Sequence, residues 1–229
     1  MSELLLELFS EEIPSRMQAR AAEDLKRLAA DALKAQGLAV ASVQTFATPR
    51  RLVLVAQGVP AKSPDISEAR KGPRVGAPEK AIEGFLKGAG LASIDQATLV
   101  KDDKKGDFYV AKIDKPGRDA AAIIAEVIPD VIAKFPWPKS QRWGAGTLTW
   151  VRPLHSIVCL LDGQVVPFGV GGIASGRTTR GHRFHGNEPF EVSSFEDYGK
   201  KLKAHKVLLP ASERASWIGE QARAIAAEA

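Results

Sequence analysis

The stretch Leu4-Leu5-Leu6-Glu7-Leu8-Phe9-Ser10-Glu11-Glu12-Ile13-Pro14 stands near the start of the 229-residue chain. Its apolar first half predicts a short buried strand. Pro14 ends this run, because proline pushes the residue before it toward extended geometry. Residues 15–36 then repeat apolar side chains every three or four positions, which predicts an amphipathic helix with Ser15 as its cap and Gly37 as its stop.

Outward from this stretch, short apolar runs alternate with amphipathic segments. Residues 60–78 contain four prolines and are expected to form a loop or linker. Pro129 is expected to kink its helix or divide it into two segments. Asp162-Gly163 is a strong hairpin signal. Strands are expected at 43–46, 52–55, 97–100, 108–113, 148–151, 156–161, 165–168 and 190–192, and helices at 79–89, from Asp119 onward, at 194–205 and after Pro210. These elements predict an α+β fold of mixed short strands and amphipathic helices, with a β-rich basic segment in its second half and a helical C-terminal end.

The expected domain organisation follows from the same pattern. Residues 1–192 form an N-terminal α+β domain, either in one piece or as two lobes divided at 60–78. Residues 193–229 are expected to be the helical start of a following domain. The last helix still runs at Ala229 without a stop signal, so we expect an N-terminal fragment of a longer chain.

Composition excludes several classes of protein. With 45% hydrophobic and 26% charged residues, the chain has the balance of a folded domain. No apolar run approaches the ~20 residues of a membrane span, and the N-terminus lacks the basic region of a signal peptide. Cys159 is the single cysteine, which excludes a disulfide framework. A cytoplasmic protein without membrane contact is expected.

Positive charge is unevenly distributed. The chain carries a formal +5, but residues 131–186 hold seven Lys or Arg against Asp162 alone, a formal +6, leaving −1 for the remainder. Three of the four tryptophans, Trp137, Trp143 and Trp150, fall in the same segment. A local excess of arginine with interleaved aromatics favours an anionic partner, nucleic acid first. The alternative is a set of arginines spread around a solvated face.

The densest basic group is Arg177-Thr178-Thr179-Arg180-Gly181-His182-Arg183-Phe184-His185. Its guanidinium groups, hydroxyls and loop amides can chelate a phosphate or carboxylate. In an extended segment Arg180 and His182 face away from Arg177 and Arg183, so a shared anion requires the loop to curl. Contact with a nucleic-acid backbone and a structural or inter-subunit arginine cluster both remain open, with catalysis as the weakest reading.

The basic turn Thr48-Pro49-Arg50-Arg51 has two readings, an anion or interface contact and an ordinary solvated turn. The candidates for nucleic-acid or interface binding share a cationic or hydrogen-bonding side chain and lie in the basic segments. They are Arg177, Thr178, Thr179, Arg180, His182, Arg183, Arg50, Arg51, Arg142 and Arg152.

No self-contained active site is expected. The sequence has no phosphate-binding P-loop motif, no His-Glu-x-x-His and no Gly-x-Ser-x-Gly. His182 and His185 lack neighbouring Cys, Asp or Glu to complete a zinc shell. Glu11 and Glu12 are adjacent and point apart in an extended segment, so one is expected to cap the following helix and the other to be solvated or salt-bridged. His155 is expected to be a satisfied core histidine, with a functional histidine as the alternative. We therefore predict no catalytic residue and no metal ligand here.

Several strings, taken together and in order, resemble the N-terminal part of the beta subunit of bacterial glycyl-tRNA synthetase of the heterotetrameric kind. The likeness extends from the first residues to about Gly186 and more loosely to the end. Besides the opening stretch, the strings are Phe46-Ala47-Thr48-Pro49-Arg50-Arg51-Leu52, Arg70-Lys71-Gly72-Pro73, Phe135-Pro136-Trp137-Pro138-Lys139, Arg142-Trp143-Gly144, Val151-Arg152-Pro153-Leu154-His155 and Ser175-Gly176-Arg177-Thr178-Thr179-Arg180-Gly181-His182-Arg183-Phe184.

This resemblance implies part of an enzyme of two alpha and two beta subunits that joins glycine to tRNA(Gly). ATP and Mg²⁺ are then used in the alpha subunit, and this fragment holds no cofactor. Its implied partners are the alpha subunit, tRNA(Gly) and a second beta subunit. Two roles follow: a tRNA-contacting arm of the ligase, or an assembly module that docks the alpha subunit without touching RNA.

Overall fold

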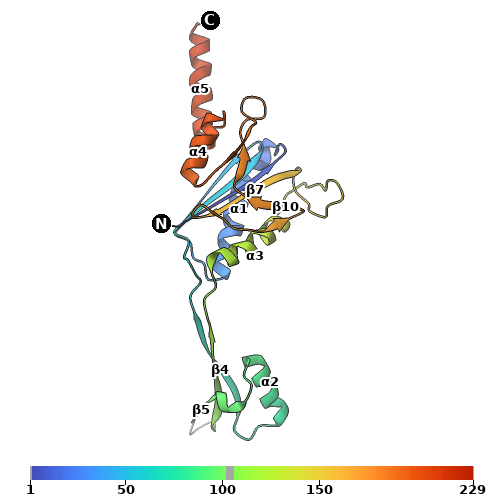
Figure 1. Ribbon diagram of the computed structural model, residues 1–229, viewed down its shortest axis with the longest axis vertical. Helices are drawn as coiled ribbons and strands as arrows, with labels where there is room; N and C mark the ends of the chain where they lie inside the picture. Colours follow the sequence, from blue (N-terminus) through green and yellow to red (C-terminus); the bar gives the residue numbers. More distant parts are fainter. Residues whose placement is uncertain (1, 102–105, 229) are drawn as a thin grey trace. The chain divides into compact units, whose positions relative to one another are not determined.

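The computed structural model describes residues 2–101 and 106–228, and these form two compact units (Figure 1). Unit 1 combines Met1–Lys62 with Asp119–Ala229, and unit 2 is Ser63–Arg118. The sequence of unit 2 is therefore inserted into that of unit 1. The predicted boundary at residue 192 stays a prediction.

Unit 1 is built on a mixed sheet. In the described part of the chain this sheet has seven strands in the order β2-β3-β1-β7-β10-β9, with β8 paired to β7. Neighbouring strands are antiparallel except for the parallel pair β7 and β10. The strands are β1 (Glu3–Ser10), β2 (Ser42–Thr48), β3 (Arg51–Gln57), β7 (Leu154–Leu161), β8 (Gln164–Val165), β9 (Gly169–Val170) and β10 (Ile173–Gly176).

A short hairpin and four helices complete unit 1. The hairpin pairs β11 (Thr178–Arg180) with β12 (Pro189–Glu191). The helices are α1 (Ser15–Ala35), α3 (Ala120–Ala133), α4 (Phe195–Ala204) and α5 (Ala211–Glu228).

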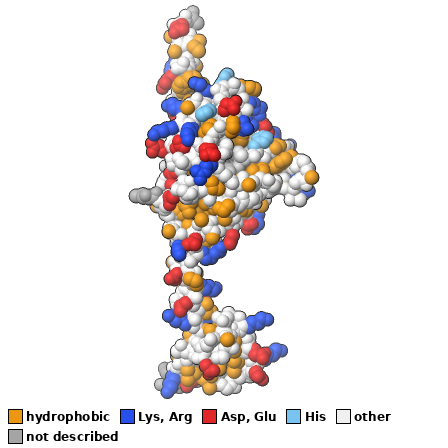
Figure 2. All heavy atoms as spheres, viewed as in Figure 1, with side chains coloured by type: hydrophobic (Ala, Val, Ile, Leu, Met, Phe, Trp, Pro, Cys, Tyr) orange, Lys and Arg blue, Asp and Glu red, His pale blue; other side chains and the backbone are white. Residues whose placement is uncertain are grey.

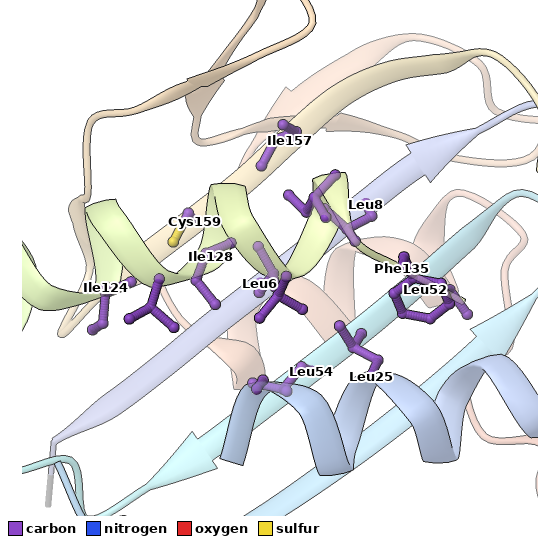
Figure 3. Close-up of a cluster of buried hydrophobic side chains, with 14 of the residues drawn as sticks. Leu6, Leu8, Leu25, Leu52, Leu54, Ile124, Ile128, Phe135, Ile157 and Cys159 are labelled. Atoms are coloured by element: carbon purple, nitrogen blue, oxygen red, sulfur yellow. The ribbon is translucent and has the colours of Figure 1, made fainter. Parts of the chain in front are cut away.

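One face of the sheet is covered by α1 and α3 (Figures 1 and 3). Side chains alternate along a strand, so every second residue of β1 and β3 points to these helices. Leu6 and Leu54 pack there with Leu25 of α1 and Ile128 of α3. Phe135 follows α3 and joins the same core.

The opposite face of the sheet packs against α4. Leu5 of β1, Val53 of β3 and Val158 of β7 form a second core with Tyr198 and Leu202 of α4. β1 thus lies at the centre of a three-layer arrangement and is buried on both sides. This explains why its sequence is a continuous apolar run rather than an alternating one.

Glu7 is the single charge among residues 4–9, and its carboxylate is fully buried on the α4 face. Thr179 and Tyr198 each donate a hydroxyl hydrogen bond to it. Arg51 lies beside it, with Nε 3.6 Å from Oε2, and donates through Nη2 to the backbone oxygen of Arg180 at 2.8 Å. Burial, followed by the Glu7 charge, raises the pKa of the Tyr198 hydroxyl, which therefore stays protonated and able to donate.

Unit 2 has a small core of its own. Its strands form a sheet in the order β4-β6-β5, against which one helix packs. Phe85, Ala89 and Ala111 are its buried apolar residues. Its elements are β4 (Ile66–Arg74), α2 (Glu79–Ala89), the 3₁₀ turn η1 (Ile94–Gln96), β5 (Thr98–Val100) and β6 (Phe108–Lys115).

The predicted α+β class is confirmed, with helix at the C-terminal end. The helix from residue 15 ends at Ala35, followed by Gly37 at φ 82°, although Pro14 rather than Ser15 occupies the cap position. The turn Asp162-Gly163 joins β7 to β8 with both residues at positive φ, as a two-residue hairpin requires.

Several expectations about local structure are wrong. The strand expected at 165–168 is limited to β8, which ends at Val165. Residues 66–74 form β4 rather than a loop, because β6 pairs with them and Pro73 lies at a register shift where a missing N–H is tolerated. Pro129 does not divide α3, whose buried Ile and Val side chains hold one continuous helix, while a kink at Pro129 stays a prediction. Residues 148–151 form no strand, and their one β-bridge pairs Trp150 with Gln141. The Trp150 side chain is fully buried in the core.

The first testable prediction concerns the buried charge. Glu7→Gln keeps the shape of the side chain but leaves the Arg51 guanidinium buried without its counter-ion. We expect the free energy of unfolding of unit 1 to fall by about 3–5 kcal/mol. Urea unfolding followed by tryptophan fluorescence measures this, because all four tryptophans lie in unit 1.

The matched control is Glu196→Gln on α4. Glu196 pairs with Lys200 at an exposed i, i+4 position, so its replacement should leave the unfolding midpoint almost unchanged. Equal effects of the two substitutions would contradict a structural role for the Glu7 pair.

Candidate functional site

Segments that are far apart in sequence meet at one end of the central strands. The segment after β1 carries Glu11, and the turn between β2 and β3 carries Arg50. Backbone hydrogen bonds join the two: Ser10 N donates to Arg50 O at 2.8 Å, and Glu11 N donates to Pro153 O at 2.9 Å. The β11–β12 hairpin brings Arg183 to the same place. Strand pairing thus fixes the site without any local sequence motif.

Glu11 is the centre of an ion-pair cluster. Its carboxylate accepts from Arg183 Nη2 and lies 3.3 Å from Arg50 Nη2 and 2.8 Å from His155 Nε2. Arg183 Nη1 is also 3.5 Å from a carboxylate oxygen of Glu12. Arg50 is further held by Phe9, whose ring centroid lies 4.7 Å below its guanidinium carbon. The cluster positions cationic groups before any ligand binds.

The cluster shifts the acid–base behaviour of its carboxylate. The hydrogen bond from His155 lowers the pKa of the Glu11 carboxyl below its ordinary value, and the charges of Arg50 and Arg183 add to this effect, against the opposing effect of burial. Burial in turn lowers the pKa of the Arg50 guanidinium, partly offset by Glu11. Glu11 is therefore ionised at neutral pH and holds the arginines in place.

A hollow of about 540 Å³ opens beside this cluster, and we call it the polar hollow. Arg180 joins the cluster here, with Nη1 donating to Asn187 O at 2.8 Å. Three guanidinium groups face one carboxylate, so the hollow has an excess of positive charge. The charged and histidine side chains that line it are Glu11, Arg50, His155, Arg180 and Arg183.

A second hollow of about 320 Å³ adjoins the first, since Arg50 and Arg183 line both. We call it the Phe184 hollow, after its most exposed aromatic side chain. Its walls are partly apolar, with Val207 and Leu208 on one side. Its charged lining residues are Glu12, Arg50, Arg51, Arg183, Lys206 and Arg214.

The loop of residues 181–188 between β11 and β12 is held against the end of α4. His182 N donates to His205 O at 2.9 Å. A Cβ added at Gly181 would lie 2.3 Å from both Gly186 O and His205 Cβ, closer than real side chains approach. Glycine at 181 thus permits the close contact that makes the segment curl. This curl brings Arg180 and Arg183 to one hollow, which an extended segment would not do.

The structure separates the predicted binding residues into groups. Arg50, Thr178, Arg180, His182 and Arg183 line the two hollows. Two more predicted residues, Arg51 and Thr179, reach the lining of these hollows from buried positions. Arg51 and Thr179 are buried and hold Glu7, while Arg142, Arg152 and Arg177 are absent from the lining of both hollows.

The tryptophans correct one expectation. They do not alternate with arginines on a surface, because Trp150 is fully buried, and Trp137 and Trp143 pack against the same core. The Trp137 and Trp150 ring centroids are 5.0 Å apart. On the face drawn in Figure 2, basic, acidic and histidine side chains are interspersed, without an unbroken basic surface.

Two further expectations about single residues are wrong. His155 is not a core histidine, since its side chain is 44% exposed and bonded to Glu11. Neither Glu11 nor Glu12 caps α1, which has no side-chain cap. Sequence reasoning also missed Lys206, which follows α4, and Arg214 of α5, both of which line the Phe184 hollow. No sequence signal connects them to Arg50, because tertiary packing brings them together, including a hydrogen bond from Arg214 Nη2 to Ala47 O at 3.0 Å.

Among residues 2–101 and 106–228, no helix has the length and apolar character to cross a membrane. The same residues contain no group of three or more His, Cys, Asp or Glu placed around a common metal position. The polar hollow and the Phe184 hollow together lie at one end of the sheet, and we call the pair the cationic double hollow.

Comparison with known proteins places this scaffold in a family. Residues 4–229 match the family described as glycyl-tRNA synthetase beta subunit. The chain is 53% identical over 230 residues to the glycine–tRNA ligase beta subunit of Paracoccus denitrificans (strain Pd 1222), covering 99% of the chain and 33% of that protein. It is 56% identical over 226 residues to the same subunit of Ruegeria sp. (strain TM1040), covering 97% and 33%.

The chain belongs to the glycyl-tRNA synthetase beta subunit family, as the resemblance of its sequence strings predicted. It spans about a third of the length of the curated relatives it matches, and corresponds to their N-terminal part.

The second testable prediction concerns Glu11. Its folded-state pKa lies below its ordinary value of 4.5, so its ion pairs stabilise the fold fully above that pH and are lost as the pH falls through the folded-state pKa. Glu11→Gln should lower stability at neutral pH by about 1 kcal/mol, a modest value because the side chain is partly exposed to screening solvent. The difference from the unsubstituted chain should shrink below pH 4.5. Urea unfolding across this range measures it.

Glu12→Gln is the control, because the Glu12 side chain is 66% exposed and contacts Arg183 alone among the ion pairs of this cluster. It should change neither stability nor its pH dependence appreciably. A pH-independent loss in Glu11→Gln would argue against the assignment of the lowered pKa.

The third testable prediction concerns the curled loop. Gly181→Ala forces the loop away from His205 and should destabilise unit 1 by about 1–3 kcal/mol. Gly176→Ala, five residues earlier, has open space and no positive φ, and should be close to neutral. Thermal unfolding of both variants tests this, and equal melting temperatures would disprove the packing role of Gly181.

Proposed function

We propose that this chain is a non-catalytic part of a glycine–tRNA ligase and that its cationic double hollow contacts the phosphate backbone of tRNA(Gly). The observation that carries the proposal is the convergence of Arg50, Arg180 and Arg183 around the polar hollow. Arginine is suited to this role, since its planar guanidinium group binds phosphate oxygens in a bidentate manner. Family membership supplies the nucleic acid as the polyanion.

The charge balance of the hollow supports an anionic ligand. Glu11 neutralises one positive charge, and the guanidinium of Arg180 is bound to a backbone carbonyl, not to a carboxylate. A bound phosphate therefore finds cationic groups that are already oriented, which reduces the entropic cost of ordering them.

Glycine activation is assigned in this proposal to the alpha subunit, together with ATP and Mg²⁺. The donor set of the polar hollow does not fit Mg²⁺, which prefers several carboxylate or phosphate oxygens in an octahedral shell. Its one carboxylate, Glu11, is engaged by two arginines and a histidine. The proposed enzyme contains two alpha and two beta subunits and acts in the cytoplasm.

Subunit assembly is the second candidate function, and α5 favours it. No described residue of α5 is buried, and its side chains Trp217, Ile218 and Ile225 are exposed. Hydrophobic side chains are visible on the surface of this helix in Figure 2. Contiguous exposed apolar surface is typical of protein interfaces, and these side chains could form it when α5 meets a partner. In this alternative the chain docks the alpha subunit or a second beta subunit without direct contact with RNA.

The fourth testable prediction separates these roles. Arg180→Gln with Arg183→Gln, introduced into the full-length beta subunit purified with its alpha partner, should weaken tRNA(Gly) binding. Each lost phosphate contact lowers the slope of log K against log salt concentration by about 0.9, so the double variant should lose roughly 1–2 units of slope. Filter binding over a range of salt concentrations measures this slope.

Arg142→Gln with Arg177→Gln is the matched control. It removes the same charge from the same basic segment but outside both hollows, so it should leave the slope nearly unchanged. If the Arg180 and Arg183 variant keeps its slope but loses the alpha subunit on purification, assembly is the correct function instead.

A further inference from the structure

Phe184 is an aromatic side chain held in solvent beside arginines. Its exposed fraction of 78% is the largest of any large hydrophobic side chain in the described part of the chain. A single exposed aromatic side chain is ordinary, whereas exposed apolar side chains rimmed by polar residues mark binding surfaces, so the inference depends on what surrounds this ring. Neither the core nor the Glu11 cluster accounts for this side chain.

The exposure of Phe184 is fixed by its loop and is not a consequence of a loose segment. Gly186 N donates to His182 O at 3.0 Å and closes the loop around Phe184. The base of the loop is tied to α4 through His205 and to its own far side through Arg180 and Asn187. The ring is therefore presented from a rigid base.

Other flat rings accompany it. The ring centroids of His182 and Phe184 are 6.1 Å apart with an interplanar angle of 54°. Those of His182 and His185 are 4.7 Å apart and stacked at 25°. Phenylalanine and histidine are side chains on which unpaired nucleic-acid bases stack. An aromatic surface next to cationic groups is the combination that single-stranded binding sites use.

The electrostatic surroundings favour an anionic ligand. Arg51 and Arg214 are engaged within the chain, the latter by the carbonyl oxygens of Ala47 and Leu208. Arg50, Arg183 and Lys206 also line this hollow, where Glu12 is the only carboxylate among the described lining residues. Arg50 and Arg183 are paired with Glu11 in the adjoining cluster, so a phosphate here would compete with that carboxylate. A base over Phe184 would thus have its phosphate near Arg183, at the border with the polar hollow.

We propose that Phe184 is a stacking platform for an unpaired base of the RNA, with Arg183 and Arg50 neutralising the adjoining phosphate. This inference rests on the proposed function, and it deepens it by assigning a single-stranded nucleotide to the Phe184 hollow. A duplex alone would leave Phe184 without a partner, because its bases are stacked within the helix.

The fifth testable prediction uses three substitutions of Phe184 in the full-length beta subunit purified with its alpha partner. Phe184→Ala removes the ring, Phe184→Leu keeps an apolar side chain without a π-face, and Phe184→Trp keeps a flat ring. Ala and Leu should weaken tRNA(Gly) binding by roughly 10-fold or more, the size of one base–aromatic stack. Trp should stay within about 3-fold of the unsubstituted protein.

Two further readouts make the result specific. The slope of log K against log salt should be the same in all three variants, because no phosphate contact is lost. Binding of a blunt RNA duplex of matched length should be unaffected by any of them. Thermal unfolding should also be unchanged, since the side chain is exposed.

Each other outcome decides against the inference. Full tRNA binding by Phe184→Ala overturns it, and so does retained binding by Phe184→Leu, which would indicate an ordinary apolar contact. Loss of the alpha subunit from Phe184→Ala on purification would show a protein contact instead. The proposed function fails separately, if the variant at Arg180 and Arg183 keeps the slope of log K against log salt concentration. If that slope changes but the Phe184 variants bind tRNA(Gly) normally, only the stacking inference is overturned.

Discussion

The buried ion pair between Glu7 and Arg51 is the interaction on which the rest of unit 1 depends. A carboxylate in the centre of a sheet that is covered on both faces requires internal partners, because its desolvation costs several kcal/mol. Its partners come from a neighbouring strand, from the β11–β12 hairpin through Thr179 and from α4 through Tyr198. One charge therefore specifies how four elements meet.

The candidate site is a consequence of that arrangement. Arg51 donates to the backbone of Arg180, and this hydrogen bond holds the hairpin that carries Arg180 and Arg183 against the end of the sheet. Glu11 then orients the outer guanidinium groups. The buried Glu7–Arg51 pair stabilises the fold, whereas the Glu11 cluster positions cationic groups at the surface, although both combine glutamate with arginine. A bound phosphate must compete with Glu11 for Arg50 and Arg183. This competition favours phosphate contacts that form and break readily.

Local sequence signals predict most of the helices and strands, but they fail where contact with a distant segment determines the structure. The helix at 15–35 and the β7–β8 hairpin follow from apolar periodicity and turn residues, both of which act over a few positions. The strand at 66–74 could not be predicted in the same way, since prolines and charges favour a loop until β6 provides a partner some 40 residues later. The strand predicted around Trp150 is wrong for a related reason. The sequence identifies an aromatic residue but does not show whether its side chain faces the core or the solvent.

The family, the α+β class and the concentration of arginine in the second half of the chain can be predicted from residue identity and short spacing. Which arginines act together depends on how the chain folds in space. Arg50 joins Arg180 and Arg183 across 130 residues of chain through strand pairing, whereas Arg177, closest to them in sequence, lies outside both hollows. The physical reason is that electrostatic contacts depend on distance in space, which the register of β1, β3 and β7 and the packing of α4 set.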